Sequence, residues 1–123
     1  MTKSVFLVDD SATMLMSLKG TLEISGFKVE TASDGEAALG KLRAGLKPDL
    51  IITDINMPRL DGFGVIEGVR ASSTHRSIPV LVLTTETGRD LKERAQKAGA
   101  TGWIVKPFDD TRLIDTINRV LGL

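Results

Sequence analysis

Short apolar segments alternate with longer segments of helical periodicity along the chain, and this alternation constrains the fold more than any other feature. Five runs rich in β-branched and aliphatic residues are each too short for a helix and are typical of strands. They are Val5–Val8, Phe27–Ala32, Leu50–Thr53, Ile78–Leu83 and Trp103–Val105. Strands that alternate with helices form parallel sheets through right-handed crossovers, so the pattern predicts an α/β fold.

The segments between and after these runs predict five helices. The clearest lies near the C-terminus, where apolar residues recur at helical spacing. Its apolar positions are Leu113, Ile114, Ile117, Val120 and Leu121. The segment from Phe63 to Val69 predicts a helix that is short. The central strand runs are continuously apolar, as in strands buried on both faces, so we expect helices on both sides of the sheet.

Composition narrows the class of protein. A length of 123 residues predicts one domain, covering residues 1–123, without a second catalytic or output domain. The absence of cysteine excludes disulfides and thiol chemistry. Sixteen Lys and Arg residues balance sixteen Asp and Glu residues, which argues against nucleic acid or an anionic membrane as a partner. No stretch approaches the roughly 20 apolar residues that span a bilayer, so we expect a soluble cytoplasmic protein. A monomer is the expected oligomeric state.

Polar residues follow four of the five predicted strands. They are Asp9-Asp10, Asp54, Thr84-Thr85 and Lys106-Pro107. The carboxyl ends of parallel strands meet along one edge of the sheet, where ligands bind in folds of this class. We therefore expect these side chains to form one site.

Taken singly, each of these residues also has a structural explanation. Asp10 or Ser11 could cap the following helix, and Thr84 or Thr85 could cap a later one. Asp54 could be a turn residue, and the lysine could be a solvated surface charge. It is their predicted convergence that favours a functional site.

Three neighbouring carboxylates, those of Asp9, Asp10 and Asp54, would repel one another without a cation. An all-oxygen ligand set favours a hard ion, and a few carboxylates beside a phosphoryl group favour Mg²⁺ over Ca²⁺. Lys106 would supply a positive charge and Thr84 a hydroxyl for the phosphoryl oxygens, leaving one carboxylate to act as a nucleophile.

These residues together resemble the receiver domain of two-component response regulators, and in particular its single-domain chemotaxis members. The motifs are Asp9-Asp10, Asp54 followed by Ile55-Asn56-Met57-Pro58 and Asp61-Gly62, Thr84, and Lys106-Pro107-Phe108. The resemblance covers the whole chain. It implies a flavodoxin-like, doubly wound sheet of five parallel strands in the order 2-1-3-4-5, with five helices.

The resemblance also assigns roles at the metal and acceptor positions. It implies that Asp54 is the phosphoacceptor and that Asp10 and Asp54 bind Mg²⁺ together with the backbone carbonyl of Asn56. Asp9 would contribute through water. No other cofactor is expected.

Further roles implied by the resemblance concern the phosphoryl group and the switch. Lys106 and Thr84 would hold phosphoryl oxygens, and the peptide bond before Pro107 would be cis.

Asn56 and Glu86 stand at positions that influence access of water to the acyl phosphate, although ordinary loop polarity explains Glu86 equally well. Trp103 stands where receivers carry a switching Tyr or Phe, and a partly buried core aromatic is an equally weighted interpretation.

The function implied is that of a phosphorylation-activated regulator that is not a turnover enzyme. A histidine kinase would be the phosphodonor. A downstream protein would bind an output face on the phosphorylated regulator, and in chemotaxis the candidate is the flagellar motor switch. A phosphatase is a further candidate partner. The expected output face contains Lys92, Gln96, Trp103 and Arg112.

Other interpretations remain open at this point. Within the family, the chain could be a phosphorelay intermediate or a regulator of another pathway. A flavodoxin-like FMN protein is disfavoured because Asp9 and Asp10 would repel the cofactor phosphate, and an aspartyl phosphohydrolase would need a substrate-capping segment. His75 is expected to be a solvated surface residue, and Met14 and Met16 are expected to fill gaps in the core.

Overall fold

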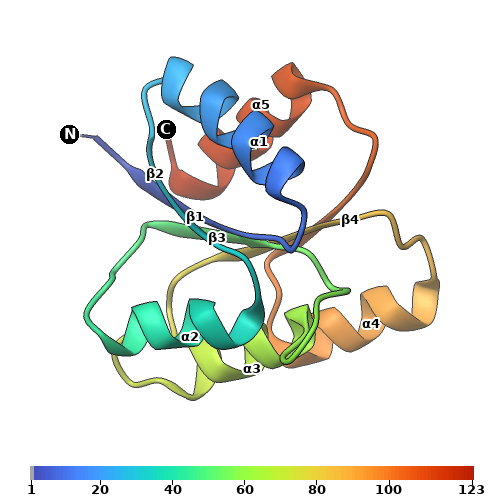
Figure 1. The fold of residues 1–123 in the computed structure, drawn as a ribbon. Coiled ribbons are helices and arrows are strands. Elements are labelled where there is room, and N and C mark those ends of the chain that lie inside the picture. Colours follow the sequence, from blue (N-terminus) through green and yellow to red (C-terminus); the bar gives the residue numbers. More distant parts are fainter. Residues whose placement is uncertain (1) are drawn as a thin grey trace.

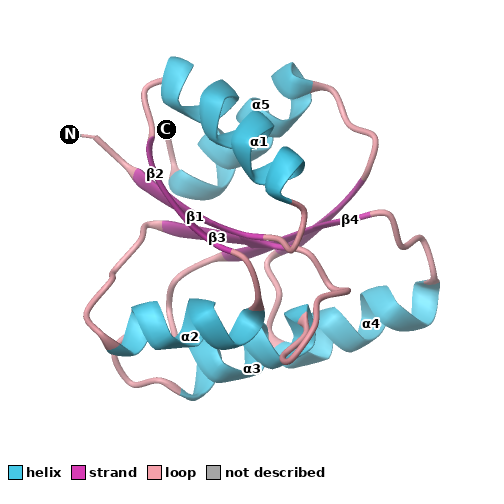
Figure 2. Ribbon diagram, in the orientation of Figure 1, coloured by secondary structure: helices cyan, strands magenta, loops and turns pink. Residues whose placement is uncertain are grey.

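The computed structural model describes residues 2–123, in which a parallel sheet lies between two layers of helices (Figure 1; Figure 2). The strands are β1 (Ser4–Val8), β2 (Lys28–Ala32), β3 (Leu50–Thr53), β4 (Val80–Thr84) and β5 (Gly102–Val105). The helices are α1 (Ala12–Ile24), α2 (Gly35–Arg43), α3 (Gly62–Ala71), α4 (Arg89–Ala98) and α5 (Asp110–Leu121). The predicted alternation of strands and helices is confirmed.

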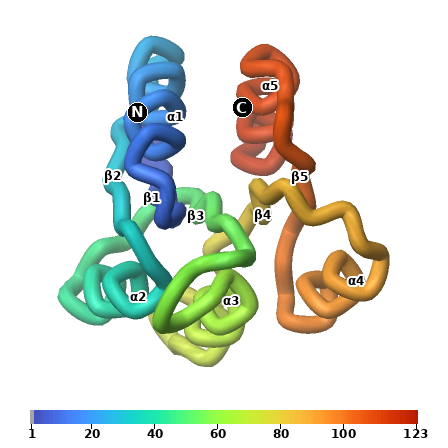
Figure 3. Tube along the Cα trace, turned by 45° about the vertical axis from the view of Figure 1, so that its right-hand side comes forward, coloured from blue at the N-terminus to red at the C-terminus, as the bar shows by residue number. Residues whose placement is uncertain are grey.

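The sheet has the strand order β2-β1-β3-β4-β5, with every pair parallel. The chain therefore reverses its direction of travel across the sheet after β2, when it returns past β1 to form β3 (Figure 3). This confirms the predicted doubly wound order. Ligand sites in such sheets lie where the order reverses, at the carboxyl ends of the strands.

Successive side chains along the strands point to opposite faces and so build two separate cores. Phe6, Ile51 and Val82 belong to a core covered by α2, α3 and α4. Leu7 and Ile52, one position further along their strands, belong to a second core covered by α1 and α5. Figure 1 shows this division of the helices between the two faces.

Element boundaries differ from the predicted ones at a few places. Residue 27 lies outside β2, because the Phe27 amide donates to the carbonyl of Leu22 and closes the turn after α1. β4 begins at Val80 rather than Ile78, since Pro79 has no N–H to give to a neighbouring strand. α3 has ten residues, as many as α4, so the expectation that it would be short is wrong.

Two expectations about single residues are also wrong. Met16 does not fill a gap in the core, because it lies on the outer side of α1 and is 78 % exposed. His75 is not a solvated surface residue, because it is 6 % exposed and its ring is bonded at both nitrogens. Nδ1 lies 2.9 Å from the hydroxyl of Ser72, and Nε2 lies 3.0 Å from the carbonyl oxygen of Leu46. Both nitrogen atoms of the buried imidazole therefore have a hydrogen-bond partner inside the protein.

Within residues 2–123, the structure has no helix that combines the length and the apolar character needed to cross a membrane.

Candidate functional site

Strand register brings the predicted site residues to one edge of the sheet. Val8 at the end of β1 is paired with Thr53 at the end of β3, and the amide of Asp54 donates to the carbonyl of Val8 at 3.0 Å. Asp9 and Asp54 therefore leave adjacent strands at the same level. On the other side, the amide of Lys106 donates to the carbonyl of Thr84 at 2.8 Å.

Three carboxylates converge at this edge. Asp9, Asp10 and Asp54 each present an oxygen atom, and these atoms lie within 4.8 Å of one another. Asp9 is buried and Asp10 is exposed, so the cluster opens to solvent on one side. The helix cap is Ser11, whose hydroxyl accepts from the amide of Met14, and not Asp10. Such an acidic cluster could bind a metal ion, and carboxylate oxygens favour hard divalent ions.

Lys106 supplies the positive charge in this cluster. Its Nζ lies 2.9 Å from Oδ2 of Asp9 and 3.3 Å from Oδ2 of Asp54, and its side chain is only 10 % exposed. The interpretation of Lys106 as a solvated surface charge is therefore wrong. The ammonium group partly neutralises the buried carboxylate of Asp9 and the partly buried carboxylate of Asp54, which would otherwise repel each other.

Asp54 is held in a fixed orientation by its surroundings. Its Oδ1 accepts from the amide of Ile55 at 2.6 Å, while Oδ2 faces Lys106. The backbone of Asp54 passes so close to Gly62 that a Cβ atom at residue 62 would lie 2.2 Å from the carbonyl oxygen of Asp54. Only glycine fits there, so Gly62 allows α3 to begin directly behind the acidic cluster.

Glu86 connects the remaining predicted residues at the rim of the site. Its carboxylate accepts from Nδ2 of Asn56 at 2.7 Å, and its amide donates to the buried hydroxyl of Thr84 at 3.3 Å. Its carbonyl accepts from Nε1 of Trp103 at 3.2 Å. Neither Thr84 nor Thr85 caps α4, because the N-cap residue is Gly88. The loop after β4 thus links the acidic site to β5.

The bond between Lys106 and Pro107 is cis, as expected. The side chain of Lys106 points back into the acidic cluster, while the chain continues toward Phe108 and α5.

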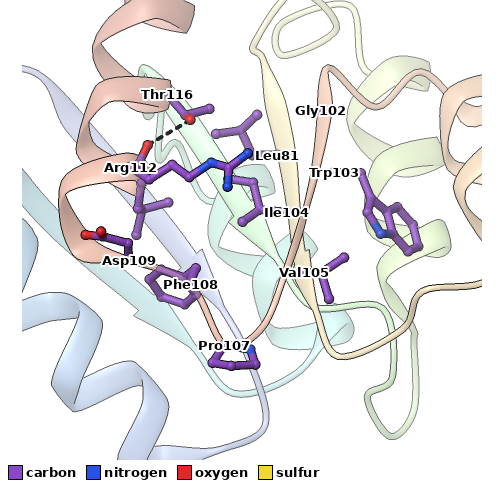
Figure 4. Close-up of a pocket in the computed structure, with 11 residues that line it drawn as sticks. Leu81, Gly102, Trp103, Ile104, Val105, Pro107, Phe108, Asp109, Arg112 and Thr116 are labelled. Atoms are coloured by element: carbon purple, nitrogen blue, oxygen red, sulfur yellow. Dashed lines mark hydrogen bonds between the residues drawn. The ribbon is translucent and has the colours of Figure 1, made fainter.

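The residues expected on an output face line two grooves beside β5. Trp103 and Arg112 line a groove of about 510 Å³ between β5 and α5, and Lys92, Gln96 and Trp103 line a smaller one of about 240 Å³ between α4 and β5. Figure 4 shows Arg112 and the indole of Trp103 on opposite sides of the strand. Trp103 packs partly against the core under α4, as expected for a partly buried core aromatic, and its role as a switch stays a prediction.

Sequence reasoning missed one charged pair near the site. Arg59 donates from Nε and Nη2 to Oδ2 of Asp34, at 3.0 and 2.7 Å, and Glu36 lies 3.9 Å from the same guanidinium group. The amide of Ala37 and then Arg59 hold the pKa of Asp34 below its ordinary value. No local sequence pattern predicts the Arg59–Asp34 pair, because the two residues are 25 positions apart.

Comparison with known proteins places this geometry in a family. The family model for the response regulator receiver domain matches residues 5–118. Chemotaxis protein CheY1 of Helicobacter pylori is 39 % identical over 119 residues, which are 96 % of each chain.

Solved structures agree with the sequence comparison. Chemotaxis response regulator CheY4 of Vibrio cholerae is 42 % identical with a TM-score of 0.91, covering 98 % of this chain and 99 % of that one. The receiver domain of sensor histidine kinase PA1611 from Pseudomonas aeruginosa, whose active-site cleft contains a coordinated magnesium ion, is 25 % identical with a TM-score of 0.90 over the full length of both chains. From the family match, the near-complete relatives and the shared fold, we conclude that this chain belongs to the response regulator receiver domain family.

Proposed function

We propose that this protein is a phosphorylation-activated response regulator whose phosphoacceptor is Asp54. The observation that carries the proposal is the convergence of Asp9, Asp10 and Asp54 beside Lys106 at the carboxyl edge of the sheet. A nucleophilic carboxylate, two further carboxylates and a fixed cation are the groups that phosphoryl transfer to an aspartate requires.

Mg²⁺ fits this donor set, with Asp10, Asp54 and the Asn56 carbonyl as ligands and Asp9 acting through water. The cluster is made of oxygen donors and is open at Asp10. The magnesium ion in the related PA1611 receiver domain supports this choice of metal. Bound there, the ion would neutralise charge that develops on the phosphoryl oxygens.

The chain's own residues would position and stabilise the transferred group. A carboxylate oxygen of Asp54 attacks the phosphorus of a phosphohistidine, the P–N bond breaks, and the histidine leaves as a neutral imidazole after taking up a proton. The product is an aspartyl phosphate. Lys106 and the hydroxyl of Thr84 bind phosphoryl oxygens, while the amide of Ile55 holds the carboxylate in place.

Signal termination follows from the same site. Water attacks the phosphorus of the aspartyl phosphate, the P–O bond to Asp54 breaks, and phosphate is released. The Asn56–Glu86 bridge spans the two loops at the rim, where it would influence how water enters. Because the protein promotes only its own phosphorylation and dephosphorylation, it is not a turnover enzyme in this proposal.

The similarity to CheY1 and CheY4 supports a role in chemotaxis, with a histidine kinase as the phosphodonor in the cytoplasm. The phosphorylated form would be read by a downstream protein through the surface around Trp103, and the flagellar motor switch is the candidate. A phosphatase that accelerates hydrolysis would fit the same cycle.

Phosphorylation by a small donor tests the assignment of Asp54. We expect intact-protein mass spectrometry to show one labile phosphoryl adduct after incubation with acetyl phosphate and Mg²⁺. Asp54→Asn should abolish the adduct, and Asp90→Asn, at an exposed aspartate on α4, should not. An adduct that persists in Asp54→Asn and maps to another residue would refute the assignment.

Metal binding tests the acidic cluster separately. We expect calorimetry to detect weak Mg²⁺ binding, and Mg²⁺ should raise the midpoint of thermal unfolding because it binds only the assembled site. Asp10→Ala should weaken binding at least tenfold, roughly the loss expected when a charged ligand is removed. Asp90→Ala is the matched control, and unchanged affinity in Asp10→Ala would show that the ion binds elsewhere.

A further inference from the structure

The loop between β3 and α3 is fastened to the start of α2 by a charged pair. Asp34 is almost completely buried at the N-cap of α2, where Oδ1 accepts from the amide of Ala37 at 2.7 Å. Its other oxygen, Oδ2, accepts both hydrogen bonds from Arg59. Arg59 is the member of this pair that belongs to the β3–α3 loop. Loss of its guanidinium would remove both hydrogen-bond donors from Oδ2 of the buried Asp34.

Backbone contacts complete the attachment. The amide of Gly35 donates to the carbonyl of Leu60 at 3.1 Å, and a Cβ atom at residue 35 would lie 2.3 Å from that oxygen. At the base of the loop, the amide of Gly62 donates to the carbonyl of Ile55 at 2.9 Å. One backbone hydrogen bond therefore closes the base of the loop, and another joins the loop to the first residue of α2. Figure 3 shows the loop passing beside the start of α2.

The backbone conformation of Arg59 is unusual for a residue other than glycine. Its φ is +67°, and among residues 2–123 it is the one non-glycine residue with positive φ. This conformation is unfavourable for a residue with a long side chain and persists only where surrounding contacts compensate for it. The two hydrogen bonds that the Arg59 guanidinium donates to Asp34 are contacts of that kind.

We propose that Arg59 and Asp34 form a clasp that positions the β3–α3 loop for binding of the metal ion needed in phosphoryl transfer. This inference rests on the proposed function, because the loop carries Asn56, two residues after Asp54, and the carbonyl of Asn56 is a proposed ligand. The clasp holds the loop in its binding conformation before the ion arrives. The apparent affinity for the metal ion is then proportional to the fraction of molecules in which the loop keeps that conformation.

The sign of the effect separates this role from simple electrostatics. Arg59 carries a positive charge and Mg²⁺ is a cation. If the charge of Arg59 acted only through space, its removal would strengthen metal binding. If Arg59 positions the loop, its removal weakens metal binding in spite of the favourable change in charge.

Three variants test the clasp. Arg59→Asn tolerates the left-handed backbone but is too short to reach Asp34, so it removes the clasp with little new strain. Arg59→Lys retains the charge and the reach and should restore part of the effect. Arg89→Asn is the matched control, because Arg89 is exposed and makes no ion pair or side-chain hydrogen bond with any described residue of the chain.

We expect the Mg²⁺ concentration for half-maximal binding to rise about threefold to tenfold in Arg59→Asn, as for a loop that is competent in about a third to a tenth of molecules. It should be intermediate in Arg59→Lys and unchanged in Arg89→Asn. The rate of phosphorylation by acetyl phosphate at saturating Mg²⁺ should change less than about twofold, since the ion restores the loop. Unchanged or tighter Mg²⁺ binding in folded Arg59→Asn would overturn the proposal.

Hydrogen exchange in metal-free protein provides a readout that does not depend on the metal. The amides of Gly35 and Gly62 should lose protection in Arg59→Asn, while amides in β1 and β3 retain it. Equal loss of protection throughout the chain would mean that Arg59 is only a stabilising residue and would overturn the proposal. If wild-type protein neither binds Mg²⁺ nor accepts phosphate, the proposed function fails, and this exchange comparison still decides whether the clasp exists.

Discussion

At the scale of single residues, two cations organise the site in different ways. Lys106, which follows β5, reaches the carboxylates that directly follow β1 and β3, so one ammonium group links the ends of three strands. Arg59 instead links two loops through a forked pair of hydrogen bonds to Asp34. A lysine suits the first position because it is a compact point charge, and an arginine suits the second because its planar fork can donate twice to one carboxylate.

The lowered pKa of Asp34 predicts a specific dependence of stability on acid. Because the folded-state pKa lies below the ordinary value of 3.8, folding favours the ionised carboxylate. The stabilisation is complete above the unfolded-state pKa and is lost as the pH falls through the folded-state pKa. Urea unfolding between pH 6 and pH 2 should therefore show a wild-type advantage over Asp34→Asn that shrinks below about pH 4. Parallel stability curves for the two proteins would contradict this.

At the scale of elements, α1 shows how a helix is held by one face only. Leu18 and Leu22 lie in the core between α1, α5 and the sheet, whereas Met16, on the same helix, is largely exposed. Both Leu and Met favour helices, so local propensity does not distinguish them. Burial, and not residue type, decides what each contributes to stability.

A matched pair of substitutions in α1 measures this difference. Leu22→Ala should lower the free energy of unfolding by about 2–5 kcal/mol, because it removes a fully buried side chain and leaves a cavity. Met16→Ala should change it by less than about 0.5 kcal/mol, since Met16 is exposed. Chemical denaturation monitored by circular dichroism checks both values. Similar losses in the two variants would show that the outer face of α1 is covered in solution.

At the scale of the whole molecule, one path of contacts leads from Thr84, at the end of β4, to the grooves beside β5. Thr84 accepts from the amide of Glu86, and the carbonyl of Glu86 accepts from the indole of Trp103. Trp103 in turn lines grooves on both sides of β5. Packed side chains move between discrete arrangements, so a displacement of Thr84 toward a phosphoryl group should alter the environment of Trp103.

Trp103 is the only tryptophan in the sequence, so its fluorescence reports this change directly. Loading Asp54 with beryllium fluoride and Mg²⁺, as a phosphoryl mimic, should change the emission. Thr84→Ala should weaken the change and Thr84→Ser should retain it, because the serine keeps the hydroxyl. Identical emission with and without the mimic at confirmed full occupancy would exclude Trp103 as the switch residue, and the signal would then have to pass through Lys106 or the backbone after Thr84.

The sequence by itself determined the α/β architecture and most of the candidate site. Alternating short apolar runs and helical periodicities are local signals, and a parallel sheet brings the carboxyl ends of its strands to one edge. Asp9, Asp54 and Lys106 could therefore be assigned to one site from their positions after strands. The strand order came from the family resemblance, since local patterns do not specify which strands are neighbours.

Only the tertiary structure decided how individual polar side chains are satisfied. His75 is buried because the carbonyl of Leu46, 29 residues away, faces its Nε2, and Arg59 is held by Asp34 across 25 residues. Such pairs leave no periodic pattern in the sequence, because each depends on where two loops meet. The free energy of burying a polar group is set by its partner in space, and that partner is chosen by the fold.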